Sequence, residues 1–284
     1  MRCAWKELLD ILPKWMITDV DALGRSSLQE LRLRLDAPPE LVSCDSVQRL
    51  GRQVSSEDLS YCVNAASRYS PWAAATIAQG FLTVSGGHRI GLCGEAVLKN
   101  KEITGIRKVT SLCIRVARDF PGIGSSAAGL RGSMLILGAP GRGKTTLLRD
   151  IARQISEKST VVVVDERGEI FPSGFVRGDR MDVLTGVPKA GGVEMVLRTM
   201  GPEWIAVDEI TAEEDCRSLL QAQGCGVRLL ATAHAGSLDE FRVRPIYKAL
   251  LDNHVFDYLL ILHSDRSYGT ERIHSWNSGG LERF

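Results

Sequence analysis

The sequence predicts an α/β protein in which a C-terminal domain with a mainly parallel sheet follows a smaller α+β domain. Two observations place the parallel sheet in the C-terminal part. Apolar, often β-branched runs alternate there with helix-forming segments, and a glycine-rich turn joins one such run to a helix. The third observation concerns the N-terminal part, where alternating apolar and polar residues and a Gly-Gly turn indicate antiparallel strands.

The chain length of 284 residues is sufficient for two domains. We expect the N-terminal domain over residues 1–120 and the C-terminal domain over residues 133–284. The segment 121–132 between them is rich in glycine and serine and begins with Pro121, a composition typical of a linker.

The elements of the N-terminal domain follow from periodicity and turn residues. Residues 31–35 alternate strictly between leucine and arginine, which predicts a strand with one apolar and one basic face. We also expect helices over 57–69 and 71–79, and strands over 81–84, 88–97 and 103–116, with a hairpin turn at Gly86-Gly87.

The first residues carry an apolar stripe at helical spacing, formed by Trp5, Leu8, Leu9 and Leu12 before Pro13. Charged residues interrupt the apolar part, which is typical of an amphipathic helix and not of a signal peptide. Such a stripe usually packs on its own domain. The alternative is a docking surface for a partner or a membrane.

Composition and charge are typical of a soluble globular protein, with 44% hydrophobic and 24% charged residues. The 35 Lys and Arg nearly balance the 34 Asp and Glu, so the net charge of +1 argues against nucleic-acid binding. The seven cysteines are scattered without a C-x-x-C pair, and we expect free thiols in a reducing compartment. No apolar run approaches the roughly 20 residues that span a bilayer.

The functional prediction rests on one glycine-rich stretch, Gly138-Ala139-Pro140-Gly141-Arg142-Gly143-Lys144-Thr145-Thr146. It matches G-x-x-x-x-G-K-[ST] and lies between a strand-like and a helix-like run, the context that this phosphate-binding loop requires. The glycines allow backbone N–H groups to surround phosphate oxygens, and the helix N-terminus favours negative charge. Lys144 should reach the β- and γ-phosphates, and the Thr145 hydroxyl should bind Mg²⁺.

Two later strands end in an Asp-Glu pair. The second of them, at 204–207, precedes Asp208-Glu209. We expect Asp208 to hold Mg²⁺ through water and Glu209 to orient or deprotonate the attacking water. The first, at 161–164, precedes Asp165-Glu166, and we expect Glu166 to assist catalysis. A capped and solvated strand end is the alternative for this first pair.

A further strand over 229–233 ends at His234, a candidate sensor of the γ-phosphate, although an incidental histidine at a strand end is the alternative. The sequence contains no [NT]-K-x-D motif for guanine recognition, which favours ATP over GTP. Together these features predict a RecA-like P-loop ATPase domain that uses ATP and Mg²⁺.

The N-terminal domain contributes a second group of candidates. Arginines concentrate near its end, at Arg89, Arg107, Arg115 and Arg118. They form either a solvated basic face or a set of side chains that reaches the nucleotide phosphates. The local sequence leaves both possibilities open.

The order and spacing of the P-loop, the box at 164–169, Asp208-Glu209 and His234 resemble the type II/type IV secretion ATPases, with their Walker A, aspartate, Walker B and histidine boxes. A narrower resemblance adds three N-terminal segments. Residues 28–34, 80–94 and 114–118 are similar to the stage III sporulation protein AA family of endospore-forming bacteria. With the ATPase motifs, this resemblance covers nearly the whole chain.

The resemblance implies a cytoplasmic ATPase of the mother cell. It implies a homo-oligomer, arranged as a hexameric ring, that is peripheral to a membrane and docked on membrane channel proteins. In the wider group the nucleotide lies between the two domains, and N-domain arginines reach its phosphates. Arg89, Arg107 and Arg115 are therefore candidate nucleotide contacts.

One departure from the secretion ATPases concerns the Walker B site. Those proteins usually have Gly-Glu with a following arginine, whereas this chain has Asp208-Glu209-Ile210-Thr211. The sequence also leaves open whether Glu166 or Glu209 is the main catalytic carboxylate.

We prefer a Mg²⁺-dependent ATP-hydrolysing motor that energises a membrane channel complex during sporulation. A nucleotide-gated assembly module with little turnover is one alternative. The other is a RecA-like nucleic-acid motor, against which the neutral net charge argues, although a local patch at Arg32, Arg34 and Arg118 could suffice.

Overall fold

The computed structural model describes residues 1–67, 77, 80–84, 86–99, 101–172, 174–265, 267–273 and 281–283. The chain divides into two compact units. The first comprises Met1–Asp119 with Pro172–Phe175, and the second comprises Phe120–Phe171 with Val176–Phe284. The fold is α/β, and each unit has its own sheet.

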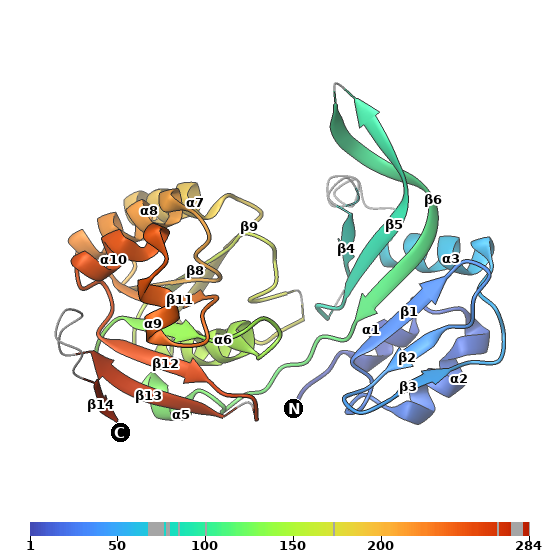
Figure 1. The fold of residues 1–284 in the computed structure, drawn as a ribbon, viewed down its shortest axis with the longest axis horizontal. Coiled ribbons are helices and arrows are strands. Elements are labelled where there is room, and N and C mark those ends of the chain that lie inside the picture. The colour runs from blue at the N-terminus through green and yellow to red at the C-terminus, as the bar shows by residue number, and fades with distance from the viewer. Residues whose placement is uncertain are drawn as a thin grey trace. The chain divides into compact units, whose positions relative to one another are not determined.

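The first unit contains an antiparallel sheet with strand order β3-β2-β1-β6-β5-β4 (Figure 1). Its strands are β1 Glu30–Arg34, β2 Glu40–Val42, β3 Val47–Arg49, β4 Phe81–Thr83, β5 Arg89–Lys99 and β6 Glu102–Arg115. Its helices are α1 Trp5–Leu9, α2 Lys14–Leu23 and α3 Ser56–Ser67. The helix expected over 71–79 lies, apart from residue 77, outside the described residues.

Sequence periodicity accounts for the packing of this unit. In β1, Leu31 and Leu33 are buried and Arg32 is exposed, as the alternation predicts. The N-terminal stripe packs on its own unit, because Leu8 and Leu12 belong to the core under this sheet. The hairpin between β4 and β5 turns at Gly86 and Gly87, whose φ angles of 84° and 83° favour glycine.

The second unit contains an eight-stranded sheet with order β14-β13-β12-β7-β11-β10-β8-β9. The strands from β12 to β9 are parallel, and β13 and β14 add an antiparallel edge. The strands are β7 Met134–Leu137, β8 Val161–Asp165, β9 Met181–Thr185, β10 Trp204–Val207, β11 Arg228–Ala233, β12 Tyr258–Leu262, β13 Tyr268–Ile273 and β14 Leu281–Arg283.

Helices cover both faces of this sheet (Figure 1). They are α5 Ser125–Ala128, α6 Lys144–Ile155, α7 Lys189–Thr199, α8 Glu213–Gly224, α9 Leu238–Arg242, α10 Lys248–Asp252 and the short 3₁₀ helix η1 Pro245–Tyr247. Alternate residues of each central strand enter two separate cores, one with α7, α8 and α10 and the other with α5 and α6. Burial on both faces explains why these strands are continuous apolar runs.

The segment expected to be a linker, 121–132, packs on α6 in the structure. The carboxylate of Asp150 accepts hydrogen bonds from the N–H groups of Gly122 and Gly124, and Ala127 in α5 is fully buried. A Cβ at Gly124 would lie 2.6 Å from Ile151 Cγ1. The glycine content of this segment therefore permits close packing on α6. Among the described residues, no helix is long and apolar enough to cross a membrane.

Candidate nucleotide site

The P-loop joins β7 to α6 at the carboxyl edge of the parallel sheet. Gly141 and Gly143 adopt φ angles of 74° and 98°, and a Cβ at either position would meet nothing within 4 Å. Glycine is therefore favoured here by the backbone conformation and not by crowding. Helix α6 begins at Lys144, so the N–H groups of its first turn have no intrahelical acceptor. An anion is the partner that such a helix start favours.

Lys144 lies against the loop that precedes it. Its side chain is buried, and its Nζ donates to Gly138 O at 2.8 Å, to Ala139 O at 3.1 Å and to His234 Nδ1 at 3.0 Å. Burial lowers the pKa of the Lys144 ammonium, whereas the charges of Asp208 and Glu209 raise it. To bind a phosphate, this ammonium must exchange its present acceptors for phosphate oxygens.

Two hydroxyl groups hold the carboxylate of Asp208. The Thr145 hydroxyl donates to Oδ2 at 2.7 Å, and the Thr232 hydroxyl donates to Oδ1 at 2.5 Å. Carboxylate and hydroxyl oxygens are the hard ligands that Mg²⁺ takes, together with water and phosphate oxygens. The side chains of Thr145 and Asp208 therefore suit a Mg²⁺ ion beside the P-loop.

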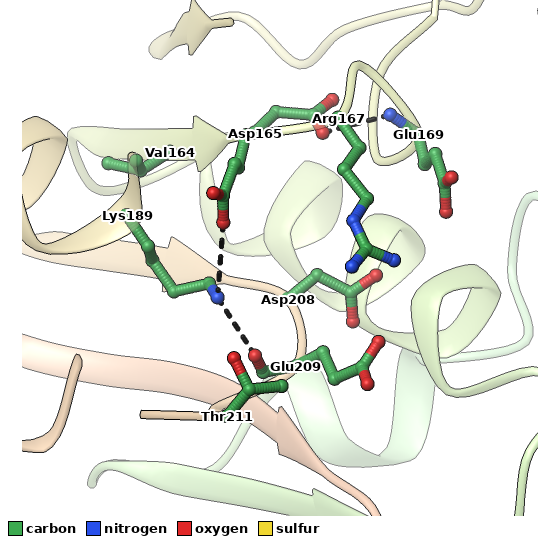
Figure 2. A pocket seen from close by; sticks show the side chains of 9 residues that line it. Val164, Asp165, Arg167, Glu169, Lys189, Asp208, Glu209 and Thr211 are labelled. Carbon is green, nitrogen blue, oxygen red and sulfur yellow. Dashed lines mark hydrogen bonds and ion pairs between the residues drawn. The ribbon is translucent and has the colours of Figure 1, made fainter. Parts of the chain in front are cut away.

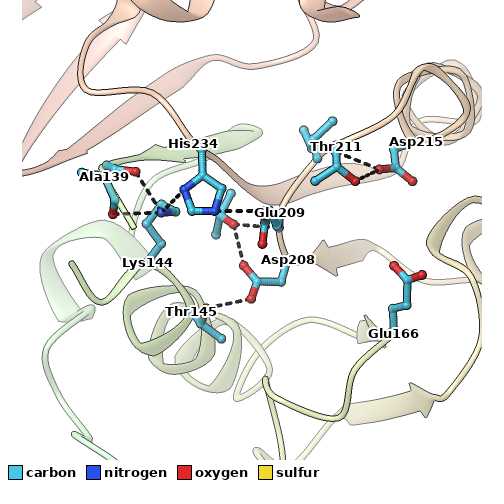
Figure 3. Close-up of polar contacts among 12 residues, drawn as sticks. Ala139, Lys144, Thr145, Glu166, Asp208, Glu209, Thr211, Asp215 and His234 are labelled. Atoms are coloured by element: carbon cyan, nitrogen blue, oxygen red, sulfur yellow. Dashed lines mark hydrogen bonds and ion pairs between the residues drawn. The ribbon is translucent and has the colours of Figure 1, made fainter. Parts of the chain in front are cut away.

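Glu209 has a left-handed backbone conformation, with φ of 45°, which is uncommon for a residue other than glycine. Its N–H group donates to the Thr232 hydroxyl at 2.8 Å, and its Oε1 lies 2.9 Å from His234 Nε2 (Figure 3). An ammonium can only donate, so Nδ1 of His234 accepts from Lys144. The proton of the neutral ring is then on Nε2, where it is donated to Glu209.

A second cluster lines a pocket of about 40 Å³ next to Glu209 (Figure 2). Asp165 is buried in it and accepts the N–H groups of Glu169, Ile170 and Phe171. Burial raises the pKa of Asp165, and the hydrogen bonds from the Phe171 and Ile170 backbone oppose that rise. Asp165 thus fixes the turn after β8.

Glu166, the residue that follows Asp165, has a different environment. Its side chain is 45% exposed, and its Oε2 lies 3.5 Å from Lys189 Nζ. Lys189 also contacts the backbone oxygen of Glu209. Glu166 therefore connects to Glu209 through a lysine that the sequence analysis did not identify.

The structure thus joins five predicted site residues in one hydrogen-bonded network: Lys144, Thr145, Asp208, Glu209 and His234. Arg142 points elsewhere, because its guanidinium donates to Ser264 O at 3.0 Å. Ala139, Pro140 and Gly141 are exposed in the turn, and Thr146 is half-buried in the first turn of α6.

The three candidate arginines lie on the sheet of the first unit. Arg89 stacks over the Phe81 ring at 4.2 Å, and Arg107 forms an ion pair with Glu95 at 2.8 Å. Arg115 is the β6 residue opposite Glu30 of β1. Their contact with nucleotide stays a prediction.

Two residues of the site were not predicted, although the sequence contains a signal for each. Thr232 is a hydroxyl residue within the buried part of β11, residues 229–233, whose other members are apolar. Lys189 is a cation in the first turn of a helix, where the helix dipole disfavours positive charge. Such departures from local preference are often found at functional positions.

The family described as "Sporulation stage III, protein AA" matches residues 7–277. This chain belongs to that family. A relative in the sporulation stage III, protein AA family, the Bacillus subtilis (strain 168) "Stage III sporulation protein AA", is 34% identical over 286 residues, covering 93% of this chain and 92% of the relative. The uncharacterized protein ycf45 of Porphyra purpurea is 30% identical over 260 residues, covering 87% of this chain and 43% of that protein.

Solved structures share the fold of this family member at low sequence identity. The Legionella pneumophila ATPase DotB has a TM-score of 0.60 at 19% identity, covering 90% of this chain and 78% of DotB. The pilus retraction motor PilT with bound ADP has a TM-score of 0.62 at 14% identity, covering 98% of this chain and 81% of PilT. The predicted family and the RecA-like α/β fold are therefore confirmed.

Proposed function

We propose that this protein is a Mg²⁺-dependent ATPase that hydrolyses ATP to ADP and phosphate. The single observation that carries the proposal is the network from Lys144 through His234 to Glu209 at the carboxyl edge of the sheet. It connects the group expected to bind phosphate with the group expected to position water. The fold shared with DotB and PilT supports this assignment.

The roles of the residues follow from their contacts. Lys144 and the first N–H groups of α6 bind the triphosphate, because they offer positive charge and unsatisfied donors. Thr145 and Asp208 hold Mg²⁺, which shields phosphate charge and orients the oxygens that it contacts. Asp208 is aligned for this by the Thr145 and Thr232 hydroxyls.

Glu209 orients the attacking water, and His234 holds the Glu209 carboxylate in position. Because the same His234 ring accepts from Lys144, a change in the position of Lys144 on binding phosphate alters the support of Glu209. His234 can therefore report γ-phosphate occupancy to the water-positioning group. Glu166 assists from the neighbouring strand end, and arginines of the first unit, with Arg89, Arg107 and Arg115 as candidates, stabilise charge on the transferred phosphoryl group.

At the level of assembly, we propose a homo-oligomer, arranged as a hexameric ring, that is peripheral to a membrane in the cytoplasm of the mother cell. There it energises a channel complex through contacts with membrane channel proteins. The family membership and the shared fold support this part of the proposal. The near-neutral net charge of +1 supports a protein partner over nucleic acid.

The deciding experiment measures ATP binding and phosphate release by the purified protein and by Lys144→Ala. We expect wild-type turnover that requires Mg²⁺, and loss of ATP binding in the variant. Intact ATP affinity in Lys144→Ala would reject the site. ATP binding by the wild type without turnover, with and without membranes that contain its partner, would favour a nucleotide-gated assembly module. Turnover stimulated by DNA, with salt-sensitive DNA binding, would favour the nucleic-acid motor.

A further inference from the structure

Lys189, the first residue of α7, contacts three acidic or carbonyl oxygens next to the nucleotide site. Its Nζ donates to Glu209 O at 2.8 Å (Figure 2). It also lies 3.4 Å from Asp215 Oδ2 and 3.5 Å from Glu166 Oε2. The side chain is 6% exposed. The shortest contact is with the backbone of Glu209, so the principal partner is a carbonyl group and not a carboxylate.

The local sequence does not favour a lysine at this position. Helix α7 begins at Lys189 after Pro188, where the helix dipole favours negative charge. The packing of α7 explains how the ammonium reaches Glu209. A Cβ at Gly192 would lie 2.6 Å from Val164 Cγ1, so the first turn of α7 lies directly on the end of β8. Glycine at 192 thus brings Lys189 close to Glu166 and Glu209.

Glu209 needs external support because its φ of 45° is strained for a residue with a Cβ. Three side chains supply that support. Thr232 accepts the Glu209 N–H group, Lys189 donates to the Glu209 carbonyl, and His234 contacts the Glu209 carboxylate. Of the groups that hold the Glu209 backbone, Lys189 is the one that also contacts Glu166.

We propose that Lys189 is a positioning residue that holds Glu209 in its left-handed backbone conformation and connects it to Glu166. The proposal rests on the ATPase function inferred above. Lys189 contacts two carboxylates, and the side chain of Glu166 is the more exposed of them, at 45%. Glu166 can therefore move away from Lys189 at a smaller cost in free energy than Asp215. A movement of Glu166 then changes the charge around Lys189 and thereby the hydrogen bond from Lys189 to the Glu209 carbonyl.

Thr211 is consistent with this assignment. Its N–H group donates to Asp215 Oδ2 at 3.0 Å. Lys189 contacts the same Asp215 oxygen. Asp215 therefore contacts both the segment that follows Glu209 and the cation that α7 supplies.

The test uses Lys189→Met, which keeps side-chain length and removes the charge, with Lys158→Met as the matched control. Lys158 is exposed and follows the end of α6, at the sheet edge opposite the P-loop. We expect Lys189→Met to bind ATP within about threefold of wild type and to hydrolyse it about 10²-fold more slowly in a single turnover. Lys158→Met should match wild type in both measurements.

A structural role would reduce ATP affinity, thermal stability and rate together, so the separation of binding from rate is decisive. Lys189→Ala provides a second readout, because methylammonium added to this variant should restore part of the rate. Unchanged hydrolysis in Lys189→Met, or parallel losses in binding and rate without rescue by methylammonium in Lys189→Ala, would overturn the proposal.

Hydrogen exchange keeps the proposal testable if the wild type hydrolyses no ATP. In Lys189→Met, the amides of residues 209–212 should exchange faster, whereas those of the P-loop should be unchanged. Unaltered exchange at 209–212 would refute the positioning role of Lys189. If the wild type shows no turnover while Lys189→Met shows the expected change in exchange, only the ATPase proposal is refuted. The two failures are therefore distinguishable.

Discussion

The Nε2 atom of His234 lies 2.9 Å from Glu209 Oε1, so the ring holds the carboxylate that we expect to position water. Replacing His234 by alanine removes this contact and one of the three acceptors of Lys144. We expect hydrolysis to fall about 10- to 100-fold while ATP affinity changes little. Single-turnover phosphate release and equilibrium binding measure the two effects. His263→Ala, at an exposed position after β12, is the control and should behave as wild type.

Glu209 and Glu166 should differ in their contribution to turnover. Glu209 contacts His234 and so belongs to the network that begins at Lys144, whereas Glu166 is connected to this network through Lys189. We therefore expect Glu209→Gln to bind ATP and to lose hydrolysis by at least about 10²-fold. Glu166→Gln should lose less. Comparison of both variants by phosphate release decides the assignment. A larger loss in Glu166→Gln would place the main catalytic carboxylate at Glu166, and equal losses would contradict the ranking.

The Thr145–Asp208 contact predicts how the protein depends on Mg²⁺. Thr145→Ala should bind ATP in the presence of a chelator as the wild type does, but Mg²⁺ should no longer tighten binding. Thr145→Ser keeps the hydroxyl and should keep the Mg²⁺ effect. Titration of a fluorescent ATP analogue with and without Mg²⁺ measures both. A full Mg²⁺ effect in Thr145→Ala would exclude this hydroxyl as a ligand.

The neighbouring glycines of α7 predict opposite changes in stability. A Cβ at Gly192 would be 2.6 Å from Val164 Cγ1, whereas a Cβ at Gly191 would have no atom within 4 Å. Gly192→Ala should lower the free energy of unfolding by about 1–3 kcal/mol through overpacking. Gly191→Ala should raise it by about 0.5–1 kcal/mol, because alanine has less entropy to lose in a helix. Urea unfolding of both variants measures the two changes, and changes of the same sign would contradict the close packing of α7 on β8.

His88 predicts the pH dependence of the first unit. Its Nε2 contacts Ala4 O at 2.7 Å and its Nδ1 accepts the Ala117 N–H, so the ring is held neutral with the proton on Nε2. Burial lowers the pKa of His88 below its ordinary value of 6.5, although the hydrogen bond with Ala4 O opposes this. The unfolded chain then binds the proton more readily than the folded chain.

The stability that His88 contributes is therefore complete above about pH 6.5 and decreases as the pH falls toward the lowered folded-state pKa. Hydrogen exchange of β1 and β6 in urea, measured from pH 7.5 to 5, follows this unit alone. His88→Gln should be less stable near neutral pH and should show a flatter pH dependence. An equally steep dependence in the variant would assign the titration to another group.

Much of the fold was accessible from the sequence because periodicity and turn chemistry act locally. The buried runs ending at Val164 and Val207 predicted strands of a parallel sheet, and the Gly86-Gly87 turn predicted the hairpin of the first unit. A glycine-rich composition by itself does not determine how a segment packs. The glycines at 122 and 124 are typical of a linker, and in the structure they also allow close contact with α6.

The sequence by itself determined the identity of the P-loop and the order of the acidic strand ends, because the spacing of these residues encodes where a strand stops and a helix starts. Only the tertiary structure decided that His234 lies between Lys144 and Glu209, and that Lys189 holds the Glu209 backbone. Those relationships depend on the order of strands in the sheet and on how closely α7 packs against β8. Both are set by long-range contacts that no local pattern records.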